Sequence, residues 1–272
     1  MPVTLCFGTI AMRRSAGAHT RKTERHMPIV DAHTHIGPCR VFDLDDTEQD
    51  LLDSMNANRI DVSLVQPYPG APSAADVHDR IAAMAQANPG RIFGIASINP
   101  HQDRDAYFGE VSRCVKELGF VAVKLHTIGH AMNPAGADGT MVFESARELG
   151  VPVMVHTGPG IPFAAPSSVA PQLEAFPDVP VVLAHAGHGL FSGEAIALAQ
   201  TYSQVSLEPS WCAFYNVGAM VAALGPGRVM LGTDLPGNVP VMIETVRALG
   251  LSDEDEAMVM GGSAAKFFKL YL

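Results

Sequence analysis

The chain alternates short apolar runs with longer amphipathic stretches, and this alternation restricts its fold more than any other feature of the sequence. The helix-like stretches include residues 45–59, 76–88, 104–118, 138–149 and 193–202. Eight strand-like runs end near His35, Gln66, Ile98, His126, His156, His185, Glu208 and Asp234. The intervals between these ends average about 28 residues, close to the size of one βα unit. Because strands that alternate with helices form a parallel sheet, we expect an α/β protein with a single-domain (β/α)8 TIM barrel.

An open, doubly wound sheet is the alternative architecture. Proteins of that class bind nucleotides through glycine-rich loops that follow a strand. No GxGxxG or GxxxxGK[ST] motif follows any of the eight runs. The barrel is therefore the favoured prediction, and a chain of 272 residues with 47% apolar residues is long enough to bury its core.

Charge and hydropathy exclude several classes of partner. The formal net charge of −10 leaves no basic patch for nucleic acid or an anionic lipid surface. No run approaches the ~18 consecutive apolar residues of a membrane span. The four cysteines are widely spaced and form no CxxC pair, which fits a reducing cytoplasm. We expect a small-molecule substrate as the partner, and the sequence leaves self-association into a homo-oligomer open.

The first 26 residues differ from the rest of the chain. Residues 1–26 carry five arginines and lysines against one glutamate and show no sustained periodicity. Such a segment resembles a transit peptide, but a loosely ordered tail or an upstream-extended start is the favoured interpretation. We therefore expect the barrel domain to span residues 27–272.

Histidines gather where the predicted strands end. Five of the eleven histidines lie at such ends: His33, His35, His126, His156 and His185. Asp234 ends the eighth run. In this type of barrel the carboxyl ends of the strands meet at one face, which carries the active site. Imidazole and carboxylate together are the ligands of a divalent metal ion such as Zn²⁺, which lowers the pKa of a bound water to ~7. The pattern predicts a metal centre that activates water.

The same motifs resemble the amidohydrolase superfamily. They are "DAHTHIG", "GFVAVKLH", "VPVMVHTG", "VPVVLAHAG" and "RVMLGTDLP", followed by a tail, "GGSAAKFFKL", that resembles the family's final helix. In order and spacing they are similar to the compact branch that includes the aminocarboxymuconate-semialdehyde decarboxylase type. The resemblance covers nearly the whole chain from Met27 onward.

The resemblance implies roles for individual residues. The implied metal ligands are His33, His35, His156, His185 and Asp234, and the implied catalytic residues are Asp234, His185 and Lys124. In members with one ion the histidine at the position of His185, on the sixth strand, orients water. In members with two ions that histidine binds the second ion, and a carboxylated lysine from the fourth strand bridges the two ions. Lys124 and His126 compete for that fourth-strand position. We expect one tightly held Zn²⁺, with a second ion or Mn²⁺ or another divalent metal left open, and Asp234 as the proton acceptor.

Three functions remain as alternatives. A metal-dependent hydrolase of a small amide, lactone or ester is the main prediction. A non-oxidative decarboxylase of an unsaturated or aromatic acid uses the same cluster and differs in needing a cationic pocket for the carboxylate. A metal-binding barrel without activity is the third. Three residues of the active-face loops are candidates for contact with the substrate: Arg40, Trp211 and Glu208.

Overall fold

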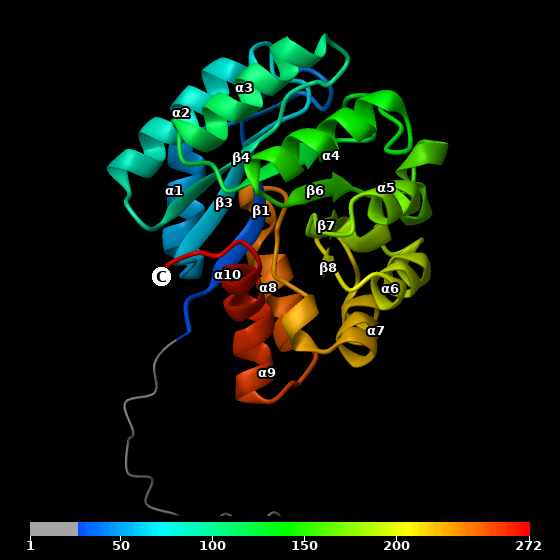
Figure 1. Ribbon diagram of the computed structural model, residues 1–272. Coiled ribbons are helices and arrows are strands. Elements are labelled where there is room, and N and C mark those ends of the chain that lie inside the picture. The colour runs from blue at the N-terminus through cyan, green and yellow to red at the C-terminus, as the bar shows by residue number, and fades with distance from the viewer. Residues whose placement is uncertain (1–26) are drawn as a thin grey trace, which may run out of the picture.

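Seven parallel strands follow one another around a curled sheet, in the order in which they occur in the sequence (Figure 1). The computed structural model describes residues 27–272, so the predicted tail of residues 1–26 lies outside the described residues. The strands are β1 (Val30–Cys39), β3 (Val62–Pro67), β4 (Ile92–Ala96), β5 (Ala122–Leu125), β6 (Val153–His156), β7 (Val181–Ala184) and β8 (Val205–Glu208). Each pairs in parallel with the next.

The eighth predicted run closes the barrel between β8 and β1 through irregular contacts. Met230 N donates to the Leu207 carbonyl at 3.0 Å, and Ala32 N donates to the Leu231 carbonyl at 2.9 Å. The register of β1 shifts between Asp31 and Thr34. There the Asp31 carboxylate replaces sheet hydrogen bonds by accepting from Thr233 N at 3.0 Å and Thr233 Oγ1 at 2.6 Å. The prediction of a (β/α)8 TIM barrel is confirmed.

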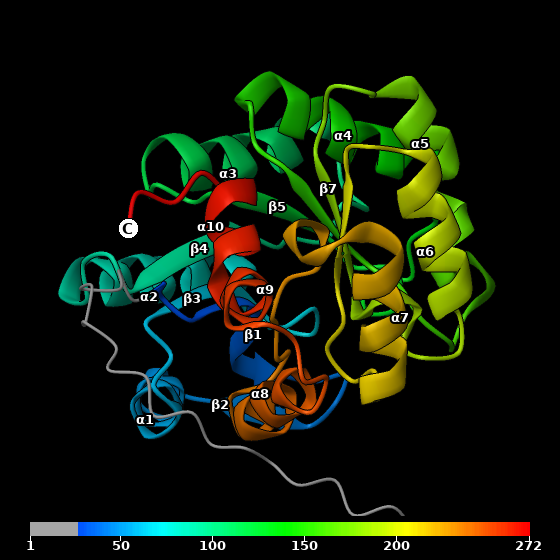
Figure 2. The same ribbon diagram turned by 90° about the horizontal axis from the view of Figure 1, so that it is seen from below.

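Ten helices of the described chain surround and close the barrel, and Figure 2 shows the longer ones as a ring around the strands. Their first residues follow the capping signals in the sequence: Ser73 and Asp103 accept backbone N–H groups at the starts of their helices, and Thr47 forms a capping box with Asp50. The helices are α1 (Glu48–Asn58), α2 (Ala74–Ala87), α3 (Arg104–Lys116), α4 (Ala137–Leu149), α5 (Ala170–Ala175), α6 (Ser192–Thr201), α7 (Phe214–Leu224), α8 (Val239–Arg247), α9 (Asp253–Ala257) and α10 (Ser263–Phe267).

Apolar side chains fill both faces of the sheet. One buried cluster inside the barrel includes Leu64, Ile95, Met154 and Met230, and a larger one packs between strands and helices. Because helices cover the outside of a parallel barrel, its strands are apolar on both faces. Within residues 27–272 no helix combines the length and the apolar character that a membrane crossing requires.

A hairpin that the sequence analysis did not anticipate covers part of the barrel mouth. The first strand continues to Cys39 instead of ending near His35, and β2 (Leu44–Asp46) folds back antiparallel to it. The Tyr68 hydroxyl donates to the Asp46 carboxylate and ties the hairpin to the end of β3. This hairpin carries Phe42 and Leu44 to the mouth, where they line a cavity.

Candidate active site

Ring nitrogens and a carboxylate converge at the C-terminal ends of β1 and of the closing segment. His33 Nε2 lies 3.2 Å from His35 Nε2 and 3.3 Å from Asp234 Oδ1. His35 Nε2 lies 3.4 Å from the same oxygen, and His185 Nε2 lies 4.0 Å from it. The sequence predicted that these four residues meet, and the barrel brings them together over about 200 residues of chain. We call His33, His35 and Asp234 the triad cluster.

Hydrogen bonds on the far side of each ring decide what the triad cluster presents. His35 Nδ1 lies 3.1 Å from the Pro67 carbonyl, which can only accept, so Nδ1 carries the proton and Nε2 carries a lone pair. His33 Nδ1 lies 2.6 Å from the Glu208 carboxylate, which favours the same tautomer. Both imidazoles therefore direct a lone pair at Asp234.

His185 belongs to a hydrogen-bonded chain that ends on the same glutamate. Its Nδ1 lies 2.7 Å from Ser210 Oγ, and that hydroxyl donates to Glu208 at 3.0 Å. Ser210 N also donates to Glu208, at 2.5 Å. Glu208 is fully buried, so one carboxylate below the triad cluster orients two of its neighbouring imidazoles.

Burial keeps the imidazoles in the form that a metal ion requires. Burial lowers the pKa of His33 well below its usual value, and the nearby Lys124 adds to this. Burial likewise lowers the pKa of His185 to about 3. Burial raises the pKa of Asp234, but the neighbouring imidazoles of His185, His35 and His33 outweigh it and hold that pKa well below its usual value. Neutral nitrogens beside an ionised carboxylate are a metal-binding set.

The spacing of these donors also fits one ion. Ligands about 2.0–2.1 Å from a metal and about 90–110° apart lie roughly 2.9–3.4 Å from one another. The three distances within the triad cluster fall in that range, from 3.2 to 3.4 Å. His33, His35 and Asp234 could hold a divalent metal ion with His185 beside it. A second group that shares His33 consists of His33, His185 and Glu208.

The fourth-strand alternatives both face inward, at different depths. Lys124 is buried, and its Nζ lies 3.1 Å from His33 Nε2. Burial lowers the pKa of Lys124 to about 8, against the opposing influence of Asp234 and Glu208. The His126 ring lies closer to the mouth and stacks on His156, with ring centroids 4.4 Å apart. His156 contacts the His185 ring at 4.6 Å but is in neither donor group that includes His33, so its role as a metal ligand stays a prediction.

A cavity of about 250 Å³ opens above the triad cluster. Its floor and one wall are His35, Asp234, His185, His156 and His126, and its other walls are Phe42, Leu44, Tyr68, Pro69 and Leu235. The Tyr68 ring stacks on His35 at 4.8 Å with an interplanar angle of 11°. Polar groups at one end and apolar walls around them suit a small, flat molecule with one charged group.

None of the three predicted substrate residues lines this cavity. Arg40 is exposed on the turn between β1 and β2, because the unanticipated hairpin carries it away from the strand ends. Trp211 is 43% exposed at the rim and donates from Nε1 to Asp234 Oδ2 at 2.8 Å, so it fastens the carboxylate instead of forming the aromatic wall. Glu208 lies beneath His33, where a substrate in the cavity cannot reach it.

Several residues of this site were missed in the sequence. Ser210 and Gly232 support Glu208: a Cβ at position 232 would lie 2.4 Å from Glu208 Cγ, so only glycine fits there. Gln66 lies 3.3 Å from His35 Nε2. Gln66 could have been found because it is a polar residue ending a strand-like run. Ser210 and Gly232 gave no such signal.

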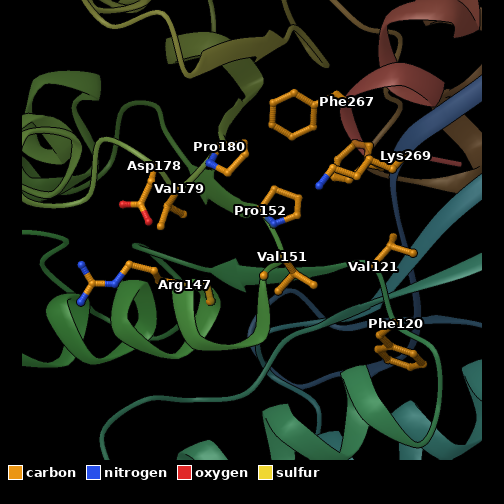
Figure 3. A pocket seen from close by; sticks show the side chains of 13 residues that line it. Phe120, Val121, Arg147, Val151, Pro152, Asp178, Val179, Pro180, Phe267 and Lys269 are labelled. Carbon is orange, nitrogen blue, oxygen red and sulfur yellow. The ribbon is translucent and has the colours of Figure 1, made fainter.

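Two other features of the described chain do not form this kind of site. His78, Glu110 and Cys114 lie together, but His78 Nδ1 contacts Glu110 at 2.7 Å and Nε2 accepts Ser97 N at 3.1 Å, so both nitrogens are engaged. A cavity of about 450 Å³ lies where β5, β6 and β7 begin, at the opposite end of the barrel (Figure 3). Its lining includes Arg147 and Lys269 but none of the strand-end histidines.

Comparison with known proteins agrees with this geometry. A family model described as amidohydrolase matches residues 30–270. The chain belongs to the amidohydrolase family. The resemblance seen in the sequence motifs is thereby confirmed, and with it an enzyme of the amidohydrolase superfamily.

Three individual proteins similar to this chain share less than a quarter of its residues in the aligned regions. Gamma-resorcylate decarboxylase of Rhodococcus jostii is 24% identical over 295 residues, covering 85% of this chain and 89% of that protein. The 2-amino-3-carboxymuconate-6-semialdehyde decarboxylase of Dictyostelium discoideum is 23% identical over 253 residues, covering 75% and 68%. The structure of 5-carboxyvanillate decarboxylase from Novosphingobium aromaticivorans, complexed with manganese and 4-hydroxy-3-methoxy-5-nitrobenzoic acid, has a TM-score of 0.70 at 15% identity and covers 91% and 97%.

Proposed function

We propose that this enzyme is a metal-dependent, non-oxidative decarboxylase of a small aromatic or unsaturated acid. The hydrolase predicted first from the sequence has less support, because both curated relatives described above are decarboxylases. The observation that carries the proposal is the cavity: apolar walls stand directly over a cluster of imidazoles and one carboxylate. Such a pocket places one anionic group of a substrate at the cluster and its flat body between Tyr68 and Leu235.

The reaction converts R–COO⁻ and a proton into R–H and CO₂. A charged carboxylate becomes neutral CO₂, so apolar walls that exclude water favour its departure. The cationic pocket expected for a decarboxylase is absent from the cavity lining in the described chain, where no lysine or arginine occurs. His33, His35 and Asp234 would hold a divalent ion, and that ion would supply the positive charge that an anionic substrate needs.

Asp234 is the proposed proton-transfer group. Its Oδ1 faces the imidazoles, and its Oδ2 accepts from Trp211 Nε1 at 2.8 Å, which fixes the carboxylate at the edge of the cavity. A carboxylate in that position can take a proton from solvent and deliver it to the carbon that loses CO₂. His185 is the second candidate, since its Nε2 lies 4.0 Å from Asp234 Oδ1.

We further propose one tightly held ion, zinc or manganese, at the triad cluster. Zinc is favoured by imidazole ligands, and manganese by carboxylate and water. Lys124 and the group of His33, His185 and Glu208 leave room for a second ion. Metal content by mass spectrometry, with anomalous scattering at the zinc and manganese edges, distinguishes these cases.

The test is a substrate screen with two readouts. Protein loaded with zinc or manganese is incubated with hydroxybenzoates and unsaturated dicarboxylates, and in parallel with lactones, esters and amides. Decarboxylation releases CO₂ and, in D₂O, places one deuterium on the carbon that carried the carboxylate, which NMR detects. Hydrolysis does neither. Turnover of lactones or amides with no CO₂ from any acid would overturn the proposal and restore the hydrolase prediction.

A further inference from the structure

The histidines at the barrel mouth fall into two kinds when their hydrogen bonds are compared. His33 and His35 contact acceptor oxygens through Nδ1, so they present a lone pair from Nε2. His126 does the opposite: its Nδ1 lies 3.0 Å from the backbone N of Gly129, which can only donate. A nitrogen that accepts a hydrogen bond carries no proton, so the proton of the neutral His126 ring is on Nε2. His126 therefore presents an N–H donor.

The orientation of the His126 ring is fixed from several sides. The ring stacks on His156 with an interplanar angle of 17°. The His126 carbonyl accepts from His130 N at 3.1 Å, which forms a tight turn at the end of the strand. Gly129 in that turn packs against Pro69, and a Cβ at position 129 would lie 2.2 Å from Pro69 Cβ. Only glycine brings the backbone N–H to this place, so turn and ring form one rigid unit.

The donor of His126 is open to the cavity. His126 is one of the residues that line it. Within residues 27–272 the His126 Nε2 forms no hydrogen bond. It is also not one of the fully buried polar atoms without a partner, so it remains accessible. The other donors of known orientation nearby are engaged: the Tyr68 hydroxyl with Asp46, and Trp211 Nε1 with Asp234.

We propose that His126 is a substrate-recognition residue whose Nε2–H donates to an oxygen substituent on the body of the substrate. This deepens the decarboxylase proposal and rests on it for the class of substrate, an aromatic acid. The acid then carries a hydroxyl or carbonyl oxygen in addition to the carboxylate that faces the triad cluster. The position of His126, with its ring centroid 6.5 Å from that of His35, separates the two recognition points.

The experiment measures binding, so that it does not depend on turnover. Trp211 is the single tryptophan of the chain and contacts Asp234 at the mouth, so its fluorescence reports binding there. Benzoate and its 2-, 3- and 4-hydroxy derivatives are titrated into the metal-loaded wild-type protein. One hydrogen bond changes affinity by roughly 2- to 10-fold, and the change is larger where the site is closed to water. We therefore expect at least one isomer to bind about 10-fold more tightly than benzoate.

The variants assign this preference to one nitrogen. His126→Phe keeps the ring and removes the donor, so the hydroxyl preference should fall to about 2-fold or less. His126→Gln places an amide N–H near the position of Nε2 and should restore part of it. His101→Phe is the matched control, because His101 is an exposed histidine that pairs with Asp138 and does not line the cavity. It should keep the full preference.

Each result decides the proposal. If no isomer binds more tightly than benzoate to the wild-type protein, or if His126→Phe keeps the preference, the proposal is wrong. If His126→Phe loses metal, His126 is a ligand and not a donor. Should His126→Phe fail to fold, His126→Leu beside His126→Gln provides the same comparison. Failure of the decarboxylase proposal appears separately, as binding without CO₂ release.

Discussion

Replacement of Glu208 by glutamine tests how the imidazoles of the proposed metal centre are oriented. One oxygen of this buried carboxylate faces His33 Nδ1 at 2.6 Å and Ser210 Oγ at 3.0 Å, and the other faces Ser210 N at 2.5 Å. Glutamine offers one oxygen and one NH₂ group. Whichever way the amide turns, its NH₂ meets either His33 Nδ1–H or Ser210 N–H, so one donor loses its acceptor.

The size of the effect follows from that lost acceptor. A buried donor without a partner costs about 1–3 kcal/mol, and loss of a carboxylate that orients a metal-bound histidine costs about 10- to 100-fold in metal affinity. The second range corresponds to roughly 1.4–2.7 kcal/mol, so the two estimates agree. We expect Glu208→Gln to bind zinc about 10- to 100-fold more weakly.

The measurement is zinc affinity by competition with a chelator of known strength, accompanied by circular dichroism to verify folding. Glu244→Gln is the matched control, because Glu244 is 69% exposed and should leave zinc affinity unchanged. Burial raises the pKa of Glu208, and a protonated Glu208 would resemble glutamine in its hydrogen bonding. Wild-type zinc affinity in Glu208→Gln would therefore refute the idea that an ionised Glu208 orients His33.

Three further changes have defined outcomes. Gly232→Ala should weaken zinc binding and lower the free energy of unfolding by about 1–3 kcal/mol, because the added Cβ would displace Glu208. The measurements are chelator competition and urea unfolding. Gly227→Ala is the control and should change neither quantity, because no atom lies within 4 Å of a Cβ at that position. Asp234→Asn should keep part of the metal, since the amide oxygen can still bind it, and lose about 100-fold or more in turnover, measured beside metal content; full activity would exclude Asp234 as the proton-transfer group. Burial raises the pKa of Glu110, but hydrogen bonds from His78 and Arg113 outweigh it and bring the pKa to about 2. Because this pKa is lowered, the stabilisation is complete above the unfolded value near 4.5 and is lost as the pH falls toward 2. Urea unfolding should show the wild type more stable than Glu110→Gln above this window, with the difference in free energy of unfolding shrinking as the pH falls through it. A difference that stays constant with pH would contradict the prediction.

The sequence by itself determined the barrel and which of the predicted metal donors lie side by side. The spacing of apolar runs encodes the βα repeat, since buried parallel strands must be apolar on both faces. Once the repeat is known, the strand ends are known, and His33, His35 and Asp234 follow as neighbours because parallel strands end at one face. These conclusions depend on local pattern and on topology alone.

The tertiary structure alone decided what each side chain does there. His33 and Glu208 are separated by 175 residues, and their contact sets which nitrogen of His33 carries the proton. The opposite tautomer of His126 comes from a backbone N–H three residues away, in a turn whose shape depends on contact with Pro69. The hairpin that moves Arg40 away from the cavity is fixed by pairing between β1 and β2. Direction and protonation of a side chain depend on the groups packed around it, which the order of residues along one strand does not specify.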